Sequence, residues 1–146
     1  MDVEKFVYVT YIASTPAKVW KALTEGELTR QYWKHTNESD WKPGSKWKHV
    51  ADDGKGTVKL VGQVIEVMPN KRLVLTWADA ADAGNAGGHS RVAIDIETVG
   101  EMVRLTVTHE DLKSAEMTKK ISNGWPRVLS SLKSFLETGR PLDTWA

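Results

Sequence analysis

The chain has 146 residues, enough for one domain with a real hydrophobic core, and we expect a single domain over residues 1–146. Its 20 basic and 19 acidic residues are interspersed and give a formal charge of +1, which argues against a nucleic-acid-binding surface. The sequence has no cysteine, which excludes disulfides, thiolate metal sites and cysteine nucleophiles. It shows no signal peptide and no apolar run of membrane-spanning length, so we expect a cytoplasmic protein without membrane insertion.

The N-terminal part of the chain predicts one strand followed by two short helices. Residues 4–12 are almost all β-formers. Thr15 can cap a helix whose first residue is Pro16. Residues 24–27 match a capping box, which predicts a second helix that carries Trp33. The polar segment 34–45 then predicts a loop.

Five strands are predicted next, because apolar and polar residues alternate between turn signals. They fall at residues 46–50, 57–68, 72–77, 92–96 and 103–109. Gly62 lies inside the longest strand, where glycine commonly marks a bulge or a bend. Residues 79–90 are rich in alanine and glycine and predict a long mobile loop. This order of elements predicts an antiparallel sheet with segregated helices, the α+β class.

A long helix is predicted over residues 115–138. Large apolar residues recur there at steps of three and four, and Gly139 can end the helix in the left-handed conformation. Gly124 and Pro126 flank Trp125, which predicts a kink or a join between two helical pieces. A bent sheet wrapped round one helix tends to enclose more volume than the helix fills, so we expect a cavity.

The sequence offers little sign of catalytic or metal chemistry. The four histidines are scattered, with no pair at i, i+4 spacing, and no Gly-x-Ser-x-Gly motif is present, so we expect no metal and no cofactor. His109 follows the inward parity of its strand and could orient a polar ligand or act as an acid or base. The alternative is a histidine that is hydrogen-bonded at the strand end and has no chemical role. Glu66 shares the parity of Val58 to Val64 and could also point inward, but its place close to the Met68-Pro69 turn favours a solvated side chain.

The tryptophans give the stronger indication of a binding site. The chain has seven, and those from separate elements that we expect round one concavity are Trp33, Trp47, Trp77 and Trp125. Rings with a single polar atom suit a flat or hydrophobic ligand. Ordinary core packing is an equal alternative for each of them.

Three parts of the sequence resemble a known superfamily: the first strand with residues 15–24, Trp77 at the end of its strand, and the segment 124–139, which reads GWPRVLSSLKSFLETG. The chain is similar to the SRPBCC superfamily, the helix-grip fold of START lipid-transfer domains and the birch-pollen allergen. Within it, the sequence resembles the branch named after the activator of the heat-shock-protein-90 ATPase. The resemblance implies a curved antiparallel sheet, with five strands after the two helices or six if one more forms, wrapped round the C-terminal helix.

The resemblance also implies a deep apolar cavity, used across the superfamily for lipids, hormones and polyketides. We therefore expect a binding module, more than an enzyme, that holds a lipid, polyketide or aromatic molecule. The expected lining is Trp33, Trp47, Trp77, Trp125 and Leu129, with His109 as a polar contact. One alternative is a polyketide cyclase-like or hydrolase-like enzyme that uses His109 or Glu66. Another is a chaperone-contacting domain like the ATPase activator. We expect a monomer.

Overall fold

Within residues 4–143, seven strands form one antiparallel sheet in the order β1-β7-β6-β5-β4-β3-β2. The computed structural model describes residues 4–143, so both ends of the expected domain lie outside the described residues. The elements are β1 (Glu4–Ile12), α1 (Pro16–Thr24), α2 (Gly26–Trp33), β2 (His35–Glu38), β3 (Lys46–Ala51), β4 (Val58–Met68), β5 (Arg72–Asp79), the 3-10 turns η1 (Ala80–Asp82) and η2 (Ala86–Gly88), β6 (Ser90–Val99), β7 (Met102–Leu112) and α3 (Ala115–Thr138).

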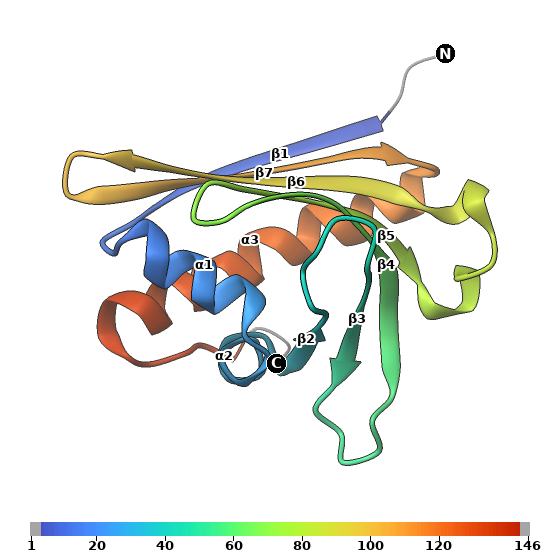
Figure 1. The fold of residues 1–146 in the computed structure, drawn as a ribbon, viewed down its shortest axis with the longest axis horizontal. Coiled ribbons are helices and arrows are strands. Elements are labelled where there is room, and N and C mark those ends of the chain that lie inside the picture. The colour runs from blue at the N-terminus through green and yellow to red at the C-terminus, as the bar shows by residue number, and fades with distance from the viewer. Residues whose placement is uncertain (1–3, 144–146) are drawn as a thin grey trace.

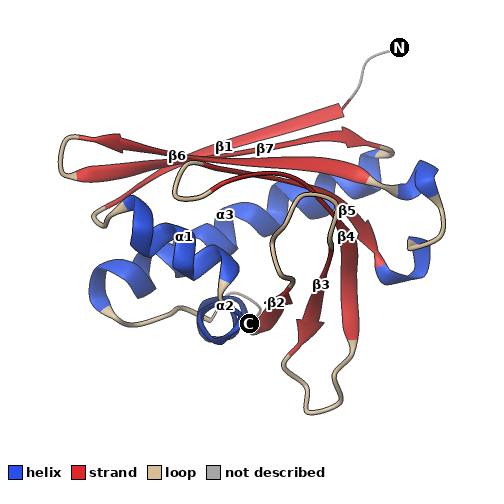
Figure 2. Ribbon diagram, viewed as in Figure 1, coloured by secondary structure: helices blue, strands red, loops and turns tan. Residues whose placement is uncertain are grey.

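The sheet curls round the long helix. Figure 1 shows β1, β7 and β6 stretching along one side of α3, whereas β3 and β4 bend away from that layer. All three α-helices lie on the same side of the β1-β7-β6 layer (Figure 2). The predicted α+β class and helix-grip arrangement are confirmed, and β2 is the additional strand. No helix within residues 4–143 is both long and apolar enough to cross a membrane.

Local signals set the ends of two helices as predicted. The hydroxyl of Thr15 accepts a hydrogen bond from the backbone N–H of Lys18 at 3.3 Å, and Pro16 begins α1. Gly139 ends α3 with φ of 80°, a left-handed conformation that glycine adopts without strain. The predicted capping box is wrong. Thr24 is still part of α1 and donates to the carbonyl of Trp20, so it is not available to cap α2.

Two further segments differ from the sequence prediction. The expected loop 34–45 contains β2, which pairs with β3 although its residues are polar. The loop 79–90 is folded into two 3-10 turns. The predicted long helix is confirmed as α3, and it runs through Pro126 without interruption, so of the two outcomes expected there the join between two pieces does not occur. Proline costs one hydrogen bond there, and the buried face of the helix compensates for it.

The core lies between the inner face of the sheet and the apolar face of α3. Val103, Leu105, Val107 and His109 alternate inward along β7 and are fully buried. The strand β1 pairs with β7, and on the face of β1 that points away from the core, Val7, Val9 and Tyr11 are 49%, 45% and 39% exposed. We call these three residues the β1 stripe. Because β1 is at the edge of the sheet, the stripe is an apolar surface on an edge strand.

Gly62 allows two strands to approach each other closely. A Cβ atom built on Gly62 would overlap the carbonyl oxygen of Thr76 and the indole nitrogen of Trp47. That indole nitrogen donates to the same carbonyl at 2.8 Å. The bare backbone at residue 62 therefore leaves room for the hydrogen bond that holds Trp47 against β5.

Replacing Gly62 by alanine should lower the free energy of unfolding by about 1–3 kcal/mol, because the added methyl group must displace backbone atoms. Urea denaturation measures this. Gly124→Ala is the matched control, since a Cβ there meets no atom within 4 Å. Alanine at that helical position should instead raise stability by about 0.5–1 kcal/mol. A Gly62→Ala protein as stable as the parent would contradict the close approach.

Candidate functional site

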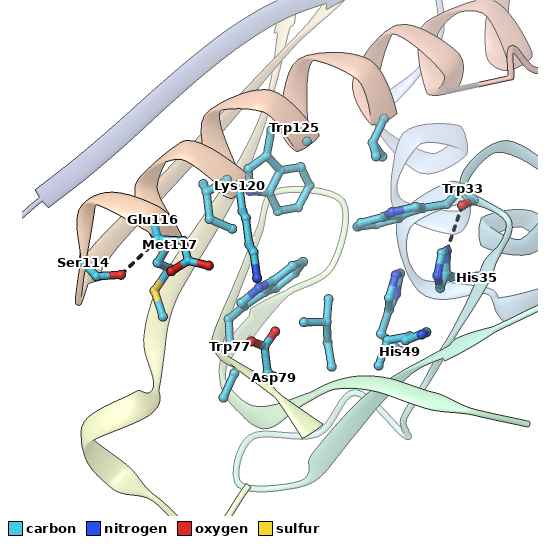
Figure 3. Close-up of a pocket in the computed structure, with 16 residues that line it drawn as sticks. Trp33, His35, His49, Trp77, Asp79, Ser114, Glu116, Met117, Lys120 and Trp125 are labelled. Carbon is cyan, nitrogen blue, oxygen red and sulfur yellow. Dashed lines mark hydrogen bonds between the residues drawn. The ribbon is translucent and has the colours of Figure 1, made fainter. Parts of the chain in front are cut away.

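A pocket of about 590 Å³ opens between α3 and the strands β3, β4 and β5. Figure 3 shows side chains from α3 on one side of it, including Lys120 and Trp125, and Trp77 and His49 facing them from the sheet. The end of α2 closes it with Trp33. The N-terminal half of the long helix is therefore one wall of the pocket, and the curled part of the sheet is the other.

Three tryptophans from three elements surround the interior of the pocket. Trp33 ends α2, Trp77 lies near the end of β5, and Trp125 lies in the middle of α3. Their ring centroids are 5.5 Å apart for Trp33 and Trp125, 5.4 Å for Trp77 and Trp125, and 6.5 Å for Trp33 and Trp77. These separations are in the range of favourable aromatic contacts. Together they form one aromatic cluster that borders the pocket.

A hydrogen-bond chain fixes the indole of Trp125 and ends on the backbone of Trp77. The N–H of Trp125 donates to Nδ1 of His109 at 3.1 Å. An indole nitrogen can only donate, so Nδ1 has no proton and Nε2 of the neutral imidazole carries it. Nε2 then donates to the hydroxyl of Ser90 at 2.7 Å, and that hydroxyl donates to the carbonyl of Trp77 at 3.1 Å. Every donor among these four groups therefore has an acceptor.

These hydrogen bonds determine what the side chain of His109 can do. The side chain is fully buried, and burial lowers its pKa to about 4. Both ring nitrogens are occupied, and a second proton would set two N–H groups against each other at Trp125. His109 therefore serves to position Trp125 rather than to exchange protons with a ligand.

A second histidine lies at the wall of the pocket itself. His49 comes from β3 and is only 3% exposed, and its Nδ1 lies 2.5 Å from Oδ1 of Asn37 on β2. Its ring stacks on His35, with centroids 4.4 Å apart, and meets Trp33 edge-on at 4.6 Å. Burial first, and the nearby His35 second, lower the pKa of His49 to about 3, so it is neutral at pH 7.

The outer part of the pocket carries charges of both signs. Lys59, Asp79, Glu116 and Lys120 all border it and are exposed. Within residues 4–143, none of the four forms an ion pair. The opening therefore has little net charge. The described residues also contain no cluster of three histidine, aspartate or glutamate side chains placed to hold a metal ion.

The six residues expected at the site occupy two layers. Trp33, Trp77 and Trp125 border the pocket. The other three, Trp47, His109 and Leu129, are buried behind them. Trp47 packs against Trp77 at 5.3 Å and borders a different hollow, of about 840 Å³.

Sequence reasoning missed His35 and His49. His49 has the same strand parity as Trp47, two residues earlier, and that signal could have found it. His35 lies in β2, a strand that the polar sequence did not indicate. Glu66, for which the sequence favours a solvated position over the inward one that parity allows, forms a partly exposed ion pair with Arg72 at 2.9 Å and is not part of the pocket. The register shift between Val64 and Glu66 interrupts the alternation on which that parity rests.

The two buried neutral histidines should make folding stability depend on pH. In the unfolded chain each has a pKa of about 6.5. The unfolded state therefore binds more protons than the folded state below that value, and the free energy of unfolding should fall as pH is lowered from 7 to 5. Each histidine contributes a slope of at most about 1.4 kcal/mol per pH unit.

The measurement is urea denaturation at several pH values between 7 and 5, where carboxylates stay ionised. The variant His109→Gln should lose one of the two contributions and show a shallower slope, whatever its absolute stability. Equal slopes in the parent and the variant would contradict a neutral His109 in the folded state.

Comparison with known proteins gives a consistent result at the level of family and fold. A family model, described as activator of Hsp90 ATPase homolog 1-like protein, matches residues 13–137. No curated protein matches the sequence. Among solved structures, protein MLL2253 from Mesorhizobium loti is 24% identical, with a TM-score of 0.77 over 91% of this chain and 96% of that chain.

Two other solved structures are named for the same activator. Aha1 from Colwellia psychrerythraea, solved in solution as a dimer, is 24% identical, with a TM-score of 0.73 over 93% of this chain and 98% of that chain. PFC0360w, an HSP90 activator from Plasmodium falciparum, is 20% identical, with a TM-score of 0.74 over 90% and 95%. At these identities the structural likeness shows the fold alone. The family model, however, spans most of the chain, and the protein therefore belongs to the activator of Hsp90 ATPase homolog 1-like family, within the SRPBCC superfamily.

Proposed function

We propose that this protein binds a hydrophobic, ring-containing small molecule between α3 and the curled end of its sheet. The observation that carries the proposal is the convergence of Trp33, Trp77 and Trp125 on one pocket of about 590 Å³. That volume is within the range of small-molecule sites, and such sites combine aromatic walls with a few polar groups. Three indoles from separate elements on the wall of one pocket are more than core packing alone requires.

The distribution of charge supports a largely apolar ligand. The polar side chains at the opening, such as Lys120 and Glu116, are exposed to water, whereas Ile121, Trp125 and Val128 behind them are buried. A molecule with an apolar body and one more polar end would match this order. The aliphatic part of Lys120 could cover the ligand while its ammonium group stays in water.

Binding has more support than catalysis. A cyclase-like or hydrolase-like reaction would need His109 or Glu66 as a working acid or base. Both ring nitrogens of His109 are occupied by Trp125 and Ser90, and Glu66 is paired with Arg72 away from the pocket. We therefore propose a carrier or sensor of a small molecule.

A pocket-filling substitution tests this proposal. Gly124 borders the pocket, and a side chain there meets open space, so Gly124→Leu should fold and occupy the site. We expect it to raise the Kd for the neutral fluorescent probe N-phenyl-1-naphthylamine at least tenfold, measured by fluorescence titration. Asn123→Leu adds the same side chain on the exposed face of the same helix and should leave the Kd unchanged.

Equal affinity for the probe in the parent and in Gly124→Leu would show that the probe does not use the pocket. Absence of binding to the parent, repeated across a panel of lipids and aromatic compounds, would count against the binding function itself.

A second candidate function is contact with a chaperone of the Hsp90 class. Its specific support is the exposed apolar β1 stripe, Val7, Val9 and Tyr11, on a protein whose family is named after a chaperone activator. Exposed apolar patches commonly mark interaction sites. This role would use the outer face of the sheet and would be independent of the pocket.

The double variant Val7→Lys and Val9→Lys should abolish binding to an Hsp90-type chaperone, measured by surface plasmon resonance, because the charges would prevent burial of the β1 stripe. Ile65→Lys changes an exposed apolar residue on β4 and should have no effect. No binding by the parent chain would remove this candidate. A parent that is dimeric in light scattering, and monomeric as the double variant, would instead assign the stripe to self-association.

A further inference from the structure

We propose that the pocket selects ring-containing ligands that carry a hydroxyl or N–H group, and that this group donates a hydrogen bond to Nε2 of His49. The inference rests on the proposed binding function and adds the chemical class of the ligand. Phenols, alcohols and N–H heterocycles belong to this class. Ethers and ionised carboxylates do not, because they have no proton to donate.

The proton of His49 is held on the nitrogen that faces away from the pocket. The side-chain amide of Asn37 donates through Nδ2 to the carbonyl of Leu23 at 3.4 Å, which directs Oδ1 toward His49. An amide oxygen only accepts, so Nδ1 of His49 is the N–H. A neutral imidazole has one N–H, and Nε2 therefore has a lone pair available.

That lone pair reaches the pocket. Among residues 4–143, Nε2 of His49 has no hydrogen-bond partner. Only Ser14 Oγ in this part of the chain is both sealed from solvent and without a partner, so Nε2 of His49 is not sealed. His49 is one of the residues that line the pocket, and Figure 3 shows it among them. We infer that the small accessible surface of its Nε2 faces the pocket.

The surroundings keep His49 an acceptor. Its low pKa, caused by burial and by His35, leaves the ring neutral, so it does not become a donor at physiological pH. The edge-on contact between His49 and Trp33, with centroids 4.6 Å apart, places the imidazole beside one of the pocket's indoles. A ring lying against Trp33 would bring a substituent at its edge close to Nε2.

The lone pair is also costly to cover with an apolar group. A buried acceptor without a partner loses the hydrogen bond that water would otherwise make to it. A ligand that displaces this water without replacing its hydrogen bond binds less tightly. Selection therefore comes both from the bond gained by a donor and from the penalty on ligands that lack one.

Two probes of similar shape test the inference: 2-naphthol, which has a donor, and 2-methoxynaphthalene, which keeps the ring system and the oxygen but has none. We expect the parent protein to bind 2-naphthol about fivefold more tightly in isothermal titration calorimetry. The ether is the more hydrophobic of the two, so burial of apolar surface alone would produce the opposite preference.

His49→Phe keeps an aromatic ring against Trp33 and removes the acceptor. It should bind both probes with similar Kd, and its affinity for the ether should be no weaker than that of the parent. Asn37→Leu is a second variant, in which the imidazole remains but loses its orienting partner, and its preference should shrink. His89→Phe changes a histidine outside the pocket and should keep the full preference.

The outcomes separate this inference from the proposed function. If the parent binds the two probes equally or prefers the ether, the pocket binds rings without preferring those that carry a hydrogen-bond donor. In that case only the inference fails. If His49→Phe and Asn37→Leu both keep the fivefold preference, the ligand donates its hydrogen bond to a group other than His49, and the inference is again wrong. If neither probe nor N-phenyl-1-naphthylamine binds the parent, the proposed function fails.

Discussion

The hydrogen-bond chain from Trp125 through His109 and Ser90 to the carbonyl of Trp77 connects α3 to three strands of the sheet. Its direction is fixed by its first member, because an indole N–H can only donate. This determines whether each later group donates or accepts at each of its contacts. A helix that is otherwise held by non-directional apolar contacts thereby acquires a defined rotation and height over β5, β6 and β7. The same hydrogen bonds fix the indole of Trp125 and hold the backbone of β5 at Trp77.

The other end of α3 is held separately. Lys133 donates to the carbonyl of Tyr11, and Glu137 accepts from the backbone N–H of Ala13 at 2.8 Å. These contacts join the C-terminal half of the helix to the end of β1. Between the two sets of contacts, Val128, Leu129 and Leu132 are buried in the core. The helix thus acts as core in its C-terminal half and as pocket wall in its N-terminal half.

Much of this fold could be predicted because it depends on local signals. The Thr15-Pro16 start of α1, the Gly139 end of α3 and the alternation along β7 are each encoded within a few residues. What failed depends on distant partners. The strand β2 forms because β3 lies beside it, and its polar residues do not reveal this. The register shift between Val64 and Glu66 is likewise a property of strand pairing that the sequence alone does not reveal.

The site could be predicted only in part, for the same reason. Parity correctly directed His109 inward, but its role depends on Trp125, a residue on another element. Trp47 and Trp77 both face the interior, and the curvature of the sheet decides which of them reaches the pocket. His49 had the necessary parity, but its importance depends on Asn37, which lies in the strand that the sequence did not indicate.

The close spacing of the indoles also gives the protein an optical property. Trp33, Trp77 and Trp125 lie with ring centroids 5.4 to 6.5 Å apart, and Trp47 is 5.3 Å from Trp77. At such distances the electronic transitions of neighbouring indoles couple, and the mutual tilt of the rings makes the coupled pairs chiral. The circular dichroism of the tryptophan bands should therefore report the arrangement of this cluster directly. A molecule that binds against this cluster would change the signal without a label, so the pocket contains its own spectroscopic reporter.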